Sequence, residues 1–376
     1  METSCVPVSC PSPVLKEFAM NRHAPRLVLI IGLIGLTMAA ESRAVTAGER
    51  GLKADNPPRK VVVGTVIFGP YGKYSGLDDR LKILGSLIDE MARDASRKFP
   101  KKGLDLAILP ETTVTSLKGR AAERAIRLEG PVKETFAALA RKHKTYIIIS
   151  MDLAEEGNHG LTYSNAAVLF DRKGDVAGIY RKAHPVAVIG TDELEGGITP
   201  GKEFPVFDCD FGRLGIQICW DVQFDDGWAA LADKGVEIVA WPTASPSTAQ
   251  PASRAARHRY HVVSSTWRED ATVFEPTGLM AAQVEAPGKI LIHQLDLSYA
   301  VLGWSAPLRN GQGLTEKYGE KVGYHYEPRE DLGLFWSNDP KMTIGEMIRS
   351  LGLEQIDAQV ERNRRLYEPA VGKLHR

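Results

Sequence analysis

The chain has 376 residues, of which 43% are hydrophobic and 25% are charged, the balance of a globular protein with a sizeable core. Lys and Arg together number 47, as do Asp and Glu, so no basic surplus is present to bind the phosphates of a nucleic acid. Four cysteines in a chain of this length exclude a disulfide scaffold, and the composition excludes collagen-like, coiled-coil and disordered classes. A globular α/β protein remains.

An apolar, uncharged run at residues 27–40 predicts an export signal. Arg22 and Arg26 precede the run, and small residues follow it, as in the three regions of a secretory signal peptide. The run is shorter than the roughly 20 apolar residues that a transmembrane helix needs. We therefore expect a periplasmic or secreted protein. An uncleaved signal anchor is the alternative, and Met20 is an alternative start of translation.

From residue 60 onward, strand-like and helix-like patterns alternate. Buried strands are predicted at 61–68, 104–109, 146–150, 236–241, 262–265 and 291–297. Amphipathic helices are predicted at 81–91, 132–142, 227–234 and 254–261. Hairpin-like pairs are predicted at 165–171 with 177–181, 204–209 with 214–219, and 271–275 with 280–285. This alternation indicates a mixed sheet layered with helices.

The organisation of the chain follows from these patterns. Residues 1–43 are expected to form an N-terminal extension with the signal, and residues 44–59, which are polar and rich in Gly and Pro, a linker. The main domain is expected at 60–299. The segment 300–376 is less periodic until a charged helix at 344–367, and we expect it to pack on the core or on a partner subunit.

Three residues with catalytic potential lie at the ends of predicted strands. Glu111 follows the strand that ends in Leu109-Pro110, Lys182 follows Tyr180-Arg181, and Cys219 closes the strand that begins at Leu214. Ligand sites in α/β sheets gather beyond the carboxyl ends of strands, so these residues are expected to converge. A carboxylate can take the proton of a thiol, and an ammonium group stabilises developing negative charge.

The motifs around these residues resemble the three signatures of the carbon–nitrogen hydrolase (nitrilase) superfamily. They are Leu109-Pro110-Glu111, the run Tyr180–Pro185 and the run Gly215–Asp221, and the resemblance extends from about residue 60 to 297. The resemblance implies a four-layer α-β-β-α sandwich and a homo-oligomer, a dimer or larger. It implies no metal and no organic cofactor.

The resemblance also implies a role for each motif residue. Cys219 is expected to be the nucleophile, Glu111 the general base, and Lys182 the cationic stabiliser. A second carboxylate is expected about eleven residues past the lysine, at Glu193, with Asp192 and Glu195 close by. The backbone N–H of Trp220 is expected to help hold the oxyanion.

The expected activity is hydrolysis of a non-peptide C–N bond in a small molecule through a cysteine thioester. Nitrile-hydrolysing relatives tend to have Cys-Trp-Glu at the nucleophile, whereas this chain has Cys219-Trp220-Asp221, which favours an amide or carbamoyl substrate. Nitrile hydrolysis by the same residues is an alternative. A catalytically inactive exported binding module is another.

Two further residue pairs have alternative interpretations. His258 and His261 have a spacing that could ligate a metal, but no third ligand is evident, and a structural role is favoured. Cys209 lies ten residues before Cys219 and is expected to pack rather than to form a disulfide with it.

Overall fold

The interior is built from strands that are buried on both faces, and β1 (Lys60–Val66) shows how the sequence does this. Successive side chains of a strand point to opposite faces. Val62 and Val66 accordingly lie in one apolar core, whereas Val61 and Val63 lie in another. A continuous β-branched run is what a strand covered on both faces requires. The strand predicted at 61–68 is therefore present.

β1 belongs to a six-stranded mixed sheet with the order β12-β1-β2-β3-β4-β5. The pairs β1–β2 and β2–β3 are parallel, and the other neighbours are antiparallel. The remaining strands of this first sheet are β2 (Leu106–Ile108), β3 (Tyr146–Gly157), β4 (Gly160–Phe170), β5 (Val176–Arg181) and β12 (Ile290–Asp296). The hairpin predicted from residues 165–171 and 177–181 is the β4–β5 pair.

The second sheet also has six strands, in the order β11-β10-β9-β8-β7-β6. Here β7–β8 and β8–β9 are parallel. Its strands are β6 (Val206–Cys209), β7 (Gly212–Ile216), β8 (Ile238–Pro242), β9 (His261–Ser265), β10 (Asp270–Phe274) and β11 (Met280–Glu285). The apolar core that contains Val61 and Val63 also contains Ile216 and Ile238 of this sheet, so the two sheets pack face to face.

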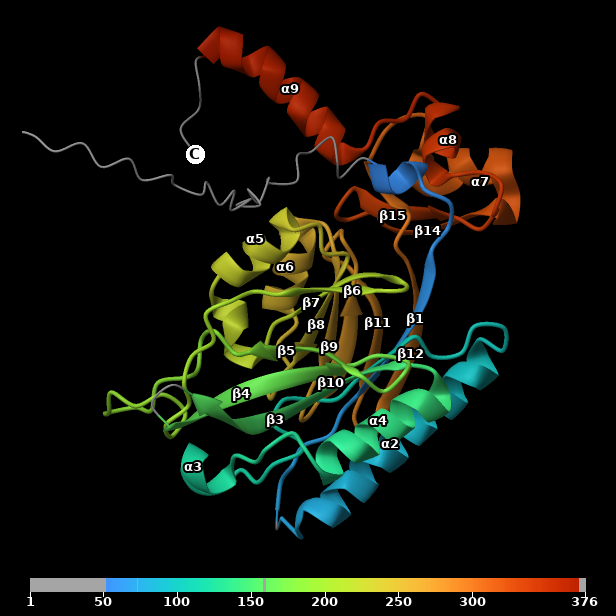
Figure 1. Cartoon of the computed structure of the whole chain (residues 1–376). Coiled ribbons are helices and arrows are strands. Elements are labelled where there is room, and N and C mark those ends of the chain that lie inside the picture. The colour runs from blue at the N-terminus through green and yellow to red at the C-terminus, as the bar shows by residue number, and fades with distance from the viewer. Residues whose placement is uncertain (1–51, 73, 158–159, 372–376) are drawn as a thin grey trace, which may run out of the picture. The chain divides into compact units, whose positions relative to one another are not determined.

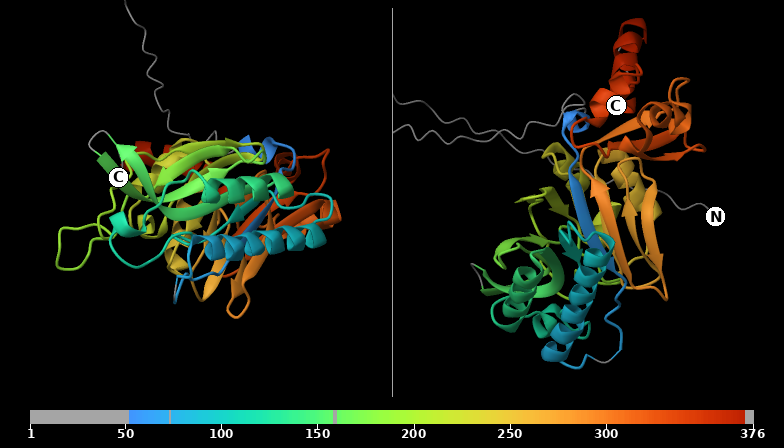
Figure 2. Two further views of the ribbon diagram at one scale, coloured as in Figure 1. Left: turned by 60° about the horizontal axis from the view of Figure 1, so that its bottom comes forward. Right: turned by 90° about the vertical axis from the view of Figure 1, so that its right-hand side faces the viewer.

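Helices cover the outer face of each sheet, and this gives the expected four-layer α-β-β-α sandwich. On the first sheet lie α2 (Leu77–Lys98) and α4 (Pro131–His143), which run side by side in Figure 1 and in the two views of Figure 2. On the second sheet lie α5 (Asp226–Asp233) and α6 (Ala249–His258). The buried residues of α2 recur at helical spacing, which explains why its sequence predicted a helix.

The C-terminal segment contains a third sheet that the sequence analysis did not identify. Strands β13 (Tyr299–Gly303), β14 (Val322–Glu327) and β15 (Leu332–Ser337) pair in the order β13-β15-β14. Their core includes Leu302 and Phe335, together with Leu314 of α7 (Gln312–Tyr318). Ala54 of η1 (Leu52–Asp55) is buried in the same core, so part of the predicted linker is structured.

The prediction of a single charged helix at 344–367 is wrong. The structure has two helices there, α8 (Ile344–Arg349) and α9 (Ile356–Val371). Gly352 lies between them with a φ of 65°, a left-handed conformation that ends a helix and that glycine adopts without strain. No residue of α9 is buried.

The computed structural model describes residues 52–72, 74–157 and 160–371. The predicted export signal at 27–40 lies outside these residues. Within them, no helix combines the length and the apolar character that crossing a membrane requires.

Candidate active site

Glu111, Lys182 and Cys219 come from three strand ends that the sandwich places together. Glu111 lies three residues past β2, and Lys182 directly follows β5. Cys219 does not close a strand as expected, because β7 ends at Ile216 and Cys219 is the first residue of η2 (Cys219–Gln223). Glu111 and Cys219 line one cavity, and Lys182 contacts Glu111. All three predicted residues therefore lie in one cluster.

Lys182 is the fully buried cation of this cluster, with only 1% of its surface exposed. Its Nζ donates hydrogen bonds to Glu111 Oε1 at 2.9 Å and to Glu195 Oε1 at 2.6 Å. Burial alone would lower the pKa of Lys182, but the negative charges around it, with Glu111 first, outweigh this effect and hold the pKa above its ordinary value. The ammonium group is therefore charged at neutral pH.

The second carboxylate of the cluster belongs to Glu195. The expected residue, Glu193, lies elsewhere. Glu193 instead forms an ion pair with Arg120, whose side chain is mostly exposed. Glu195 has a φ of 43°, and its Oε1 also accepts the backbone N–H of Val186 at 2.9 Å. Burial opposes ionisation of Glu195, but Lys182 more than offsets this and lowers the pKa of the carboxyl group.

Asn165 of β4 holds the two carboxylates in place, a role that the sequence analysis missed. Its Nδ2 donates to Glu111 Oε1 at 2.9 Å and to Glu195 Oε2 at 3.1 Å. Glu111 is also held through Oε2, which accepts the backbone N–H of Ala244 at 3.1 Å, and through its carbonyl, which accepts the indole N–H of Trp267 at 2.7 Å. These contacts join Asn165 to residues far away in the sequence, which no local pattern reveals.

Cys219 lies at a strained turn between β7 and η2. Its φ is 43°, a conformation that is uncommon for a residue other than glycine and that recurs at functional sites. Its carbonyl accepts the indole N–H of Trp241 at 3.1 Å. Burial, followed by the charge of Glu111, raises the pKa of the Cys219 thiol to about 12, although Lys182 acts in the opposite direction. The resting thiol is therefore protonated at neutral pH and needs a base.

The backbone N–H of Trp220 lies at the start of η2, directly after Cys219. The first N–H of η2 to bond back along the chain is that of Asp221, which donates to the Ile218 carbonyl at 3.0 Å. The N–H of Trp220 therefore precedes the helical hydrogen-bond ladder. The Trp220 side chain is 42% exposed.

The buried carboxylate of Asp221 joins the Cys219 turn to the end of β5. It accepts hydrogen bonds from the Tyr180 hydroxyl at 2.7 Å, the Ile218 N–H at 2.8 Å and the His184 N–H at 2.9 Å. Tyr180 and His184 flank Lys182 in the sequence. One side chain thus fixes the turn that carries Cys219 relative to the lysine, which the motif Cys219-Trp220-Asp221 alone did not reveal.

The cavity that Cys219 and Glu111 line has a volume of about 480 Å³. This lies within the range of about 300–1,000 Å³ that is typical of small-molecule sites. Asn165 and Glu195 also line it. Cys219 and Glu111 thus share one cavity of small-molecule size, and Lys182 is bonded to Glu111.

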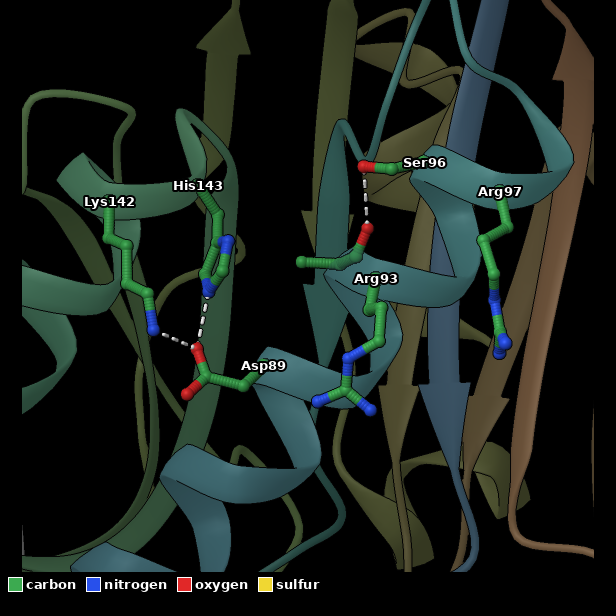
Figure 3. Close-up of a pocket in the computed structure, with 7 residues that line it drawn as sticks. Asp89, Arg93, Ser96, Arg97, Lys142 and His143 are labelled. Carbon is green, nitrogen blue, oxygen red and sulfur yellow. Dashed lines mark hydrogen bonds and ion pairs between the residues drawn. The ribbon is translucent and has the colours of Figure 1, made fainter.

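A separate depression of about 510 Å³ lies on α2 and α4 and contains none of these residues (Figure 3). There the carboxylate of Asp89 contacts Lys142 Nζ at 2.7 Å and His143 Nε2 at 2.5 Å. Arg93 and Arg97 also line it. This depression has charged groups but no thiol, so the cavity at Cys219 is the better candidate for the active site.

The alternative interpretations of two residue pairs are resolved by their surroundings. His258 Nε2 lies 2.8 Å from Asp225 Oδ1, and His261 Nε2 lies 3.2 Å from the carbonyl of Asp296, so both rings have structural partners. Among the described residues, no three His, Cys, Asp or Glu side chains are grouped so that they could hold a metal ion. Cys209 and Cys219 are both free.

Comparison with known proteins identifies the family. Residues 78–302, more than half of the chain, match the carbon-nitrogen hydrolase family model. The chain is 32% identical over 111 residues to a probable nitrilase of Schizosaccharomyces pombe, covering 30% of this chain and 39% of that protein. It is 34% identical over 117 residues to a citrullinase of Francisella tularensis, covering 31% and 39%. The matched segments thus span about two fifths of the length of these relatives.

A solved structure agrees with the fold. Nit3 of Saccharomyces cerevisiae, a member of the nitrilase superfamily, aligns with a TM-score of 0.53 at 18% sequence identity, covering 72% of this chain and 97% of Nit3. On the family match, the chain belongs to the carbon-nitrogen hydrolase family.

Proposed function

We propose that the protein is a thiol hydrolase that cleaves the C–N bond of a small amide or carbamoyl compound through a thioester at Cys219. The observation that carries this proposal is that Cys219 and Glu111 line one cavity of about 480 Å³ while Lys182 donates a hydrogen bond to Glu111. Membership of the carbon-nitrogen hydrolase family gives the reaction class. The names of the relatives, which include a citrullinase and nitrilases, supply the candidate substrate classes.

The first half-reaction forms the thioester. The Glu111 carboxylate takes the proton of the Cys219 thiol, and Sγ attacks the carbonyl carbon of the substrate. The ammonium group of Lys182 and the N–H of Trp220 stabilise the oxyanion, and one such donor contributes a factor of about 10²–10³ in rate. Glu111 then gives the proton to the nitrogen, the C–N bond breaks, and ammonia or an amine leaves.

The second half-reaction releases the acid. A water molecule gives a proton to Glu111 and attacks the thioester carbon. The C–S bond then breaks, and the thiol of Cys219 regains a proton from Glu111. Because the pKa of the resting thiol is about 12, a preformed thiolate is not the starting state, and the general base is essential. Glu195 supports this cycle by positioning Lys182, whose Nζ donates a hydrogen bond of 2.6 Å to Glu195 Oε1.

Ammonia release tests the proposal directly. The protein truncated before Ala44 is assayed with small amides, carbamoyl amino acids and nitriles, beside its Cys219→Ala and Cys209→Ala variants. Cys209 is the matched control because it is also a free thiol but does not line the cavity. Ammonia release is expected to fall by at least about a thousandfold in Cys219→Ala and to stay within twofold in Cys209→Ala. Equal activity in all three proteins would refute the proposal.

Two properties of the whole protein are part of the same proposal. The apolar run at residues 27–40 directs export, and the protein acts as a homo-oligomer. Signal cleavage is tested by N-terminal sequencing of the protein recovered from the periplasm or medium. Sedimentation equilibrium tests the assembly, and a strict monomer at working concentrations would contradict it.

A further inference from the structure

The mouth of the catalytic cavity is apolar, in contrast to its polar floor. Leu117, Val186 and Val188 line it, and each has 38–40% of its surface exposed. Trp267 adds an aromatic wall. Its indole N–H is fixed to the Glu111 carbonyl at 2.7 Å, and Tyr71 packs edge-on against its ring at a centroid distance of 5.8 Å. Four apolar side chains therefore line the same cavity as Cys219.

The loop after Lys182 turns alternate side chains toward this mouth. Val186 and Val188 line the cavity, whereas Ile189 does not and is fully exposed. The loop is held by the bond from the Val186 N–H to Glu195 Oε1 and by a bond of 2.8 Å from the Val188 N–H to the Glu193 carbonyl. The same contacts that position Glu195 thus fix two valine side chains at the mouth.

Every charged side chain that lines the cavity already has a partner. Glu111 and Glu195 share Lys182. Arg124 forms an ion pair with Asp152 and donates to the carbonyls of Gly119 at 2.9 Å and Glu195 at 2.7 Å. The three carboxylates outnumber the two cations, so the site holds no spare positive charge for a substrate carboxylate.

We infer that the substrate is an uncharged amide with an extended apolar arm, and that the mouth formed by Leu117, Val186, Val188 and Trp267 binds this arm. This inference rests on the proposed function and names its substrate class. The amide carbon reaches Cys219, and the arm covers apolar side chains that water otherwise contacts. The surplus carboxylate disfavours an anionic arm. Asp152 offers little to a cationic arm, because its Oδ1 is buried and its Oδ2 is already paired with Arg124.

A chain-length series tests the arm. The value of kcat/KM is expected to rise from acetamide through butanamide to hexanamide by about fourfold per methylene, equivalent to about 0.8 kcal/mol. Heptanamide is expected to exceed both 6-aminohexanamide and adipamic acid by at least tenfold. Val188→Ser is expected to lower the hexanamide-to-butanamide ratio at least threefold. Ile189→Ser, the matched control on the same loop, is expected to leave the ratio within twofold.

A second measurement separates failure of this inference from failure of the proposed function. Alkylation of Cys219 by N-hexyl iodoacetamide and by iodoacetate is followed by mass spectrometry, with each rate divided by the rate of the same reagent with glutathione. We expect at least a tenfold preference for the N-hexyl reagent. Val188→Ser is expected to reduce this preference, and Ile189→Ser is expected to retain it.

The outcomes then divide cleanly. Amide hydrolysis without a chain-length preference, or with preference for a charged arm, overturns the apolar mouth and leaves the hydrolase standing. No hydrolysis of any amide, together with selective N-hexyl labelling, overturns the proposed function and keeps the apolar mouth. No hydrolysis and no labelling preference overturns both.

Discussion

Asp221 Oδ2 accepts a hydrogen bond of 2.7 Å from the hydroxyl of Tyr180. This bond joins the turn that carries Cys219 to the strand end that carries Lys182. Asp221 is completely buried, and its Oδ2 also accepts the N–H of Ile218, the residue before the cysteine. The relative position of nucleophile and cation therefore depends on a carboxylate that takes no part in the proposed chemistry.

Replacing Asp221 by Asn is predicted to destabilise the protein and to lower the rate at which Cys219 is alkylated. The amide keeps one acceptor oxygen and brings an N–H₂ group against donors, so the free energy of unfolding is expected to fall by about 2–3 kcal/mol. Urea unfolding measures this, and alkylation of Cys219 under folded conditions measures the reactivity. Asp226→Asn is the control because Asp226 is exposed and also approaches His184, at 3.3 Å. Equal stability of the two variants would contradict the role of Asp221.

Glu195 and Glu193 provide a direct test of the corrected assignment. Glu195→Gln removes a negative charge 2.6 Å from Lys182 Nζ, and kcat/KM is expected to fall at least tenfold. Glu193→Gln removes the same charge from an ion pair with an exposed arginine, and kcat/KM is expected to stay within twofold. Steady-state kinetics on the preferred amide measures both. A greater loss in Glu193→Gln would restore the assignment that the family resemblance implied.

His261 is predicted to make the protein sensitive to acid. Burial lowers its pKa to about 3, against an unfolded value near 6.5. Between these values the unfolded chain binds a proton that the folded protein excludes. The contribution of His261 to the free energy of unfolding is therefore fully present above pH 6.5 and is lost as the pH falls. At pH 5 the loss is about 2 kcal/mol. His261→Gln is expected to remove this part of the pH dependence in urea unfolding at pH 8 and pH 5.

His325 is the control of opposite sign. A hydrogen bond with Glu275 raises its pKa, so its contribution is present at low pH and is lost as the pH rises through the folded pKa. His325→Gln is therefore expected to lose stability at pH 5 relative to pH 8. If both variants kept the pH profile of the parent protein, neither histidine would be the source of the dependence.

Much of the sandwich was predictable because its elements carry local patterns. β1 is a β-branched run buried on both faces, and α2 repeats its apolar residues at helical spacing. The sheet of β13, β14 and β15 was not predictable in this way. Although β14 and β15 form a hairpin, β13 pairs with β15 across residues 304–331, and the core includes Ala54 from the other end of the described chain. Such contacts leave no period in the sequence.

The candidate site was predictable in its residue types but not in its exact geometry. Glu111, Lys182 and Cys219 follow from motifs at strand ends. The resemblance placed the second carboxylate about eleven residues past Lys182, at Glu193, because a family spacing cannot locate the left-handed backbone of Glu195 or the bond from Val186 to its carboxylate. The link between Asn165 and both carboxylates joins residues 54 and 30 positions apart, which spacing rules do not reach.

The most direct test of the central claim is acid-quenched peptide mapping of Cys219 during turnover of the preferred amide. The account predicts the acyl group of that amide on the peptide that contains Cys219, and it predicts neither this adduct nor ammonia release in Cys219→Ala. Ammonia release at an undiminished rate by Cys219→Ala would contradict it.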